Sequence, residues 1–178
     1  MSTPASPPAR DLSPRQLAFG DLEHELASTR RVLERVPEEH FSWKPHEKSW
    51  SLGQLSLHLA NLLFWQITVL RQDEFDLATT PPSAAAGPAN GEELLRTWDD
   101  NVAALQQALA STDDTAFGQP WTLRRGAQVI MRQPRGAVLR GVGISHLIHH
   151  RGQLTVYLRL LNVPVPGLYG PSADEQLS

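Results

Sequence analysis

The sequence predicts an all-α protein: a four-helix bundle with a long crossover between helices two and three and a small β-hairpin before helix four. Four segments space their apolar residues by alternating steps of three and four, which places those residues on one face of a helix. Residues 112–134 lack this period and resemble two short strands around a turn at Gly126. A chain of 178 residues can bury one sizeable core, so a single domain is expected over residues 12–178.

The first helix is predicted to begin at Ser13, because Ser13 and Gln16 form a capping box and Pro14 suits the first helical position. Its core positions are Phe19, Leu22, Leu26, Thr29, Leu33 and Val36, and it should end near Pro37. Residues 1–11 lack the basic-then-apolar pattern of a secretory signal. They are expected to form a disordered tail, and the protein is expected to be cytoplasmic.

The second helix is predicted to run from a capping box of Ser51 and Gln54 to about Arg71. Residues 49–70 contain no Asp, Glu, Lys or Arg, but polar residues interrupt them too often for a membrane span. This helix is therefore expected to be the most buried, and its apolar circumference favours a homodimer. Its core positions are Leu55, His58, Leu62, Trp65 and Val69.

Residues 73–90 form a connector that, when extended, is long enough to cross the bundle and return the chain at its far end. Asn90 is predicted to cap the third helix, with core positions Leu95, Trp98, Val102, Leu105 and Leu109. The fourth helix should follow Pro134 and end before Pro164. Its predicted core positions are Leu139, Gly143, His146, His150, Gln153, Tyr157 and Leu160.

Three histidines, His58, His146 and His150, thus occupy predicted core positions of two helices. Taken singly, a core histidine is more often a structural residue with a hydrogen-bond partner, and this alternative stays open. Three imidazoles close together would repel one another on protonation, and a divalent metal relieves that repulsion. Zinc, nickel or iron would suit such a set, and the sequence does not choose among them. The chain has no cysteine, which excludes thiolate ligands and a cysteine nucleophile.

Three neighbours of these histidines are candidate site residues. His149 and Gln153 are expected to support the ligands from outside, and Arg151, next to His150, could bind an anionic small-molecule substrate. Between Ala116 and Ala173 there are seven Arg and no Asp or Glu. These arginines are either solvated or form an electropositive rim. The net charge of −3 and the lack of a basic, aromatic-interleaved motif argue against a nucleic acid or an anionic membrane as partner.

Two segments, SWSLGQLSLHLANLLFW and HLIHHRGQLTVYLRLLNVPVPGLYGPSADE, resemble the second-helix segment and the C-terminal signature of the DinB-like (DinB/YfiT) family. The resemblance covers roughly residues 12–175. Family members are four-helix bundles in which one histidine of the second helix and two of the fourth bind a divalent metal. The resemblance implies that these ligands are His58, His146 and His150.

Related proteins include metal-dependent transferases that use low-molecular-weight thiols such as bacillithiol or mycothiol. The resemblance therefore implies a metal-dependent thiol S-transferase or hydrolase, in which no catalytic residue or general base is assigned. Asp174 and Glu175 are the nearest carboxylates of the signature, and their role is open. The alternatives are a non-catalytic, stress-related metal- or ligand-binding protein and a helical interaction module whose histidines bind nothing.

Overall fold

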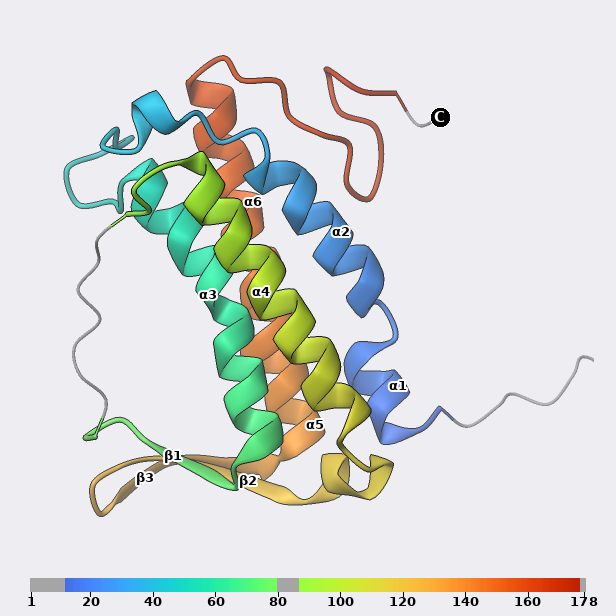
Figure 1. The fold of residues 1–178 in the computed structure, drawn as a ribbon. Helices are drawn as coiled ribbons and strands as arrows, with labels where there is room; N and C mark the ends of the chain where they lie inside the picture. Colours follow the sequence, from blue (N-terminus) through green and yellow to red (C-terminus); the bar gives the residue numbers. More distant parts are fainter. Residues whose placement is uncertain (1–11, 80–86, 177–178) are drawn as a thin grey trace, which may run out of the picture.

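A computed structural model describes residues 12–79 and 87–176 (Figure 1). The described chain is mostly helical, with one small three-stranded sheet. Its α-helices are α1 Pro14–Phe19, α2 Leu22–Leu33, α3 Leu52–Arg71, α4 Gly91–Ala110, α5 Arg135–Val138 and α6 His146–Leu160. Two 3₁₀ turns, η1 Glu38–His40 and η2 Asp114–Gly118, and a π-helical segment, η3 Leu139–Ser145, complete the helical part. The strands are β1 Glu74–Asp76, β2 Pro120–Arg125 and β3 Gln128–Pro134.

The long helices α2, α3, α4 and α6 lie side by side, and the sheet lies at one end of them (Figure 1). Helix α3 packs against α4 and α6, and α2 packs against the same two helices. Their facing side chains form one apolar core. Within the described residues, no helix is both long and apolar enough to cross a membrane.

The first predicted helix is two helices, α1 and α2, that meet at Gly20 and Asp21. The capping box of Ser13 and Gln16 is present as predicted. Glycine is a poor helix former, and the Asp21 carboxylate accepts hydrogen bonds at 2.6 and 2.8 Å from Arg140, which lies in η3. This long-range ion pair lies at the break. The predicted core face is nevertheless correct, because Phe19, Leu22, Leu26, Thr29, Leu33 and Val36 are all buried.

Helices α3 and α4 begin where the sequence predicts. Ser51 and Gln54 form a reciprocal capping box at α3, and the Asn90 side chain accepts a hydrogen bond from the Glu93 N–H at α4. The predicted connector between them contains an unpredicted strand, β1, and its residues 80–86 lie outside the described residues, as does the predicted tail 1–11.

The predicted hairpin is present as β2 and β3, which turn at Gly126 with φ of +57°. Only glycine adopts this left-handed conformation at no steric cost. The expectation of a two-stranded hairpin is incomplete, because β1 pairs in parallel with β2 and places Phe75 opposite Leu123. The Arg124 side chain joins the two strands by ion pairs to Glu74 and Asp76.

The fourth predicted helix has no break in its course, but its hydrogen-bonding pattern changes from α to π and back to α. Its middle, η3, is π-helical, and one-turn π-segments of this kind are frequent at functional sites. The most buried face of α6 is one position later than predicted, since it consists of Leu147, Arg151, Leu154 and Leu158. His146 and His150 are half-buried beside that face, whereas Gln153 and Leu160 are exposed.

Candidate metal centre

The three predicted histidines come together in space. One ring nitrogen each of His58, His146 and His150 lies within 4.8 Å of the other two. His58 comes from α3, and the other two come from successive turns of α6. The Nε2 atoms of His146 and His150 are 2.8 Å apart, so one of them donates a hydrogen bond to the other. The Nε2 atom of His58 is buried and has no hydrogen-bond partner within residues 12–79 and 87–176.

This arrangement fits a divalent metal. An unpartnered buried ring nitrogen is costly unless something binds it, and a metal ion would use its lone pair. Nitrogen ligands about 2.0–2.1 Å from a tetrahedral zinc ion are roughly 3.4 Å apart, a spacing between the 2.8 Å that separates Nε2 of His146 from Nε2 of His150 and the 4.8 Å within which all three nitrogens lie. The group contains no carboxylate, so its donors are three neutral imidazoles.

The electrostatics of the site keep these imidazoles neutral. Burial, and then repulsion from His150 and His146, lowers the pKa of His58 from 6.5 to about 4. Burial also lowers the pKa of His146, as does the charge of His149, whereas a hydrogen bond with the backbone of Val142 opposes the shift. Burial likewise lowers the pKa of His150. At neutral pH the lone pairs are therefore available to a metal.

The Gln153 side chain is largely exposed but contacts His150. Its Oε1 atom accepts a hydrogen bond at 2.7 Å from Nδ1 of His150, which leaves the lone pair of that ring on Nε2, the atom that faces Nε2 of His146. His149 is exposed, and its ring lies 4.8 Å, centroid to centroid, from that of His150. It lies outside the group of three.

The structure corrects the predicted role of Arg151. This side chain is 1% exposed, and its guanidinium contacts the Glu25 carboxylate at 2.7 Å and the Tyr169 hydroxyl at 2.7 Å. It points toward α2 and the C-terminal segment, because consecutive helical residues differ by about 100° in direction. Arg151 therefore links three parts of the chain and is not available to a substrate.

The electropositive rim, one of the two alternatives for the seven arginines, is largely neutralised. Five of the seven arginines form ion pairs with acidic residues from other parts of the chain: Arg124, Arg135, Arg140, Arg151 and Arg159. Asp174 and Glu175 belong to this network. Asp174 pairs with Arg159, and Glu175 pairs with Arg31 and Arg35 of α2. Both carboxylates thus fasten the C-terminal segment rather than approach the histidines.

Two residues of the site were not predicted. The Trp50 indole lies 5.7 Å from the His150 ring at an interplanar angle of 22°, and 4.7 Å from the His58 ring, edge to face. Its position just before the Ser51 cap was a possible signal, since the cap fixes where the preceding side chain lies. Gln66 lies two turns after His58 on the same face of α3 and is fully buried. A polar residue at that spacing could have been recognised in the sequence.

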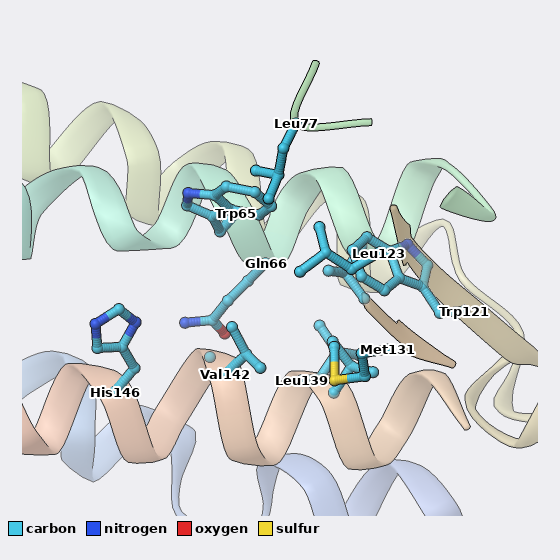
Figure 2. A pocket seen from close by; sticks show the side chains of 12 residues that line it. Trp65, Gln66, Leu77, Trp121, Leu123, Met131, Leu139, Val142 and His146 are labelled. Carbon is cyan, nitrogen blue, oxygen red and sulfur yellow. The ribbon is translucent and has the colours of Figure 1, made fainter. Parts of the chain in front are cut away.

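An apolar cavity of about 230 Å³ adjoins His146 (Figure 2). It lies between α3, η3 and the sheet, and Trp65, Trp121, Leu123 and Met131 contribute to its wall. Of the described residues that line it, none is Asp, Glu, Lys or Arg. The histidine group therefore lies at one end of a neutral, apolar space.

Known proteins resemble this chain in sequence and in fold. A Bacillus subtilis protein named YrdA, described as uncharacterized, is 27% identical over 156 residues, which are 86% of each chain. The crystal structure of a DinB-like protein from Bacillus cereus has a TM-score of 0.65 at 21% identity and covers 85% of this chain and 95% of its own. The crystal structure of the DinB-like B. subtilis protein YjoA has a TM-score of 0.62 at 18% identity and covers 92% of this chain and 99% of its own. The model of the DinB superfamily matches residues 21–154, and the chain belongs to that superfamily.

Proposed function

We propose that this protein is a metal-dependent enzyme in which His58, His146 and His150 hold a divalent metal that activates the thiol of a low-molecular-weight co-substrate. One observation carries the proposal: three neutral ring nitrogens from two helices converge within 4.8 Å, and that of His58 is buried without a partner. When bound, the metal would lower the pKa of a thiol and so supply a nucleophile at neutral pH. Zinc, nickel and iron are all compatible with the donor set.

The chain's own residues would hold and shield the reacting groups. Gln153 fixes the ring orientation of His150 by its hydrogen bond at 2.7 Å to Nδ1. The Trp50 indole covers His58 and His150 and limits their access to water. The four long helices would act as a four-helix bundle that keeps α3 and α6 at a fixed distance, because α4 packs against α3, α2 packs against α6, and α2 and α4 pack against each other.

A thiol is favoured over water as the activated group. In the part of the chain that the structure describes, no carboxylate belongs to the histidine group and could take a proton from water, and Asp174 and Glu175 are engaged with arginines. A thiol is more acidic than water by several pKa units, so it needs less help from a base. Because the chain has no cysteine, the thiol must come from a co-substrate.

The test is thiol binding to cobalt-loaded protein. Titration with bacillithiol-, mycothiol- and glutathione-type thiols should produce a cobalt–thiolate charge-transfer band for at least one of them. His149→Ala is the control that keeps the band, whereas His58→Ala should abolish it. Cobalt uptake without a band for any thiol would contradict the thiol-transferase proposal. The non-catalytic metal-binding protein would then be the better account.

A further inference from the structure

The cavity beside His146 has the size and lining of a binding site for a small, uncharged molecule. Its volume is about 230 Å³, whereas an apolar protein cavity of about 150 Å³ holds benzene. The cavity can thus accept an aromatic ring with one substituent. The indoles of Trp65 and Trp121 line it, and Phe75 of β1 packs against Trp65 with ring centroids 4.6 Å apart.

The lining argues against a charged ligand. No described residue of the wall carries a charge, and Arg151 is buried elsewhere in its pair with Glu25. A carboxylate or ammonium group would lose its hydration in this cavity without gaining a counter-charge. The polar side chains of the wall are few, and they include Gln66 and His146, the latter being one of the three candidate metal ligands (Figure 2).

Gln66 supplies a specific polar contact. The side chain reaches from α3 toward η3, between His146 and the apolar part of the cavity (Figure 2). It is fully buried, and neither its Nε2 nor its Oε1 atom has a hydrogen-bond partner among the described residues. Buried side-chain amides are rarely left with both groups unpaired. The terminal torsion of glutamine is soft, so the amide can turn toward a group that enters the cavity.

We propose that this cavity binds an uncharged molecule with an aromatic body and an amide group, and that the ligand amide pairs with the Gln66 amide. A donor and an acceptor side by side on Gln66 match the acceptor and donor of an amide, so both orphan atoms are satisfied at once. Such a ligand lies with its polar end next to His146. Binding of this ligand does not require the metal. Its further role, as the co-substrate that the activated thiol attacks, rests on the proposed function.

The experiment measures binding of two probes, benzamide and toluene, to metal-free protein by isothermal titration calorimetry. The wild type should bind benzamide at least about tenfold more tightly than toluene, because toluene leaves the Gln66 amide unpaired. Gln66→Met keeps the length of the side chain and removes both polar groups. It should abolish or reverse the preference, and Gln66→Leu provides a second variant should the first alter folding.

Two further variants locate the binding. Val142 lines the cavity and is 41% exposed, so Val142→Phe should fill the opening of the cavity. The affinity for both probes should fall about tenfold or more. Val129→Phe on β3 is the matched control, because Val129 is 58% exposed and outside the cavity, and it should change nothing. The inference is overturned if neither probe binds, if Val142→Phe has no effect, or if the preference survives both Gln66 variants. Because no metal is present, none of these outcomes depends on the thiol chemistry.

Discussion

Replacing Arg151 by methionine should destabilise the protein strongly without touching the histidines. The Arg151 guanidinium contacts the Glu25 carboxylate at 2.7 Å and donates to the Thr29 hydroxyl at 3.3 Å and to the Tyr169 hydroxyl at 2.7 Å. The side chains of Arg151 and Glu25 are only 1% and 2% exposed. Removing one partner of such a pair leaves the other charge buried, which costs about 3–5 kcal/mol.

That loss is large against a total stability of roughly 5–15 kcal/mol for a domain. Urea denaturation followed by circular dichroism would measure it. Arg159→Met is the matched control on the same helix, because the Arg159 side chain is 49% exposed in its pair with Asp174. An exposed pair contributes about 0–1 kcal/mol. The double variant Glu25→Leu/Arg151→Met should recover most of the loss, since an apolar pair can replace a buried ion pair.

The reasoning about the buried pair is refuted if Arg151→Met costs no more than Arg159→Met. It is also refuted if the double variant is less stable than Arg151→Met alone. In that case the contribution of Arg151 would come from the packing of its long side chain rather than from its charge.

Three further predictions concern pH, packing and assembly. Since the pKa of His58 is about 4 when folded and 6.5 ordinarily, only the unfolded state takes up a proton between these values. The metal-free wild type should therefore lose stability as pH falls from 6.5 toward 4, and the His58→Gln variant should lose stability less steeply. Equal slopes of the unfolding free energy against pH for the two proteins, measured by urea denaturation, would contradict this. Gly143→Ala should cost about 1–3 kcal/mol in thermal unfolding, because a Cβ atom there would lie 2.9 Å from Cγ of Gln66. Gly152→Ala should be neutral or stabilising, because a Cβ atom at Gly152 would meet no described atom within 4 Å. Equal changes in stability for the two glycine variants would contradict the packing argument. Finally, the apolar side chain of Phe64 on α3 is 57% exposed, and we propose that it lies in a homodimer interface. Light scattering should give twice 19.7 kDa for the wild type and less for Phe64→Glu, whereas a wild-type monomer would contradict the proposal.

Features with a local cause could be predicted from the sequence. Ser13, Ser51 and Asn90 cap helices because their side-chain oxygens bond to nearby backbone N–H groups. The turn at Gly126 needs a positive φ, and glycine provides it. The three histidines were found because apolar periodicity places residues on helix faces, and that periodicity depends on local geometry alone.

Features with a long-range cause could not be predicted in this way. Strand β1 has only three residues and exists because it pairs with β2, which lies far along the chain. The buried pair of Arg151 and Glu25 joins α6 to α2, so sequence adjacency to His150 was misleading. The π-helical turns of η3 change the winding that the periodicity argument assumed constant. This explains why the most buried face of α6 was predicted one position too early.

The central claim, that His58, His146 and His150 bind a metal, is tested most directly by the metal content of untagged protein purified without chelator. Mass spectrometry of the digested protein should give close to one zinc, nickel or iron per chain for the wild type. His58→Ala, His146→Ala and His150→Ala should each remove most of the metal, because each removes one of three converging ligands. His149→Ala, one residue away but outside the group, should retain it. A wild-type protein without metal that also fails to take up zinc, nickel or iron on titration, or equal loss in all four variants, would contradict the claim.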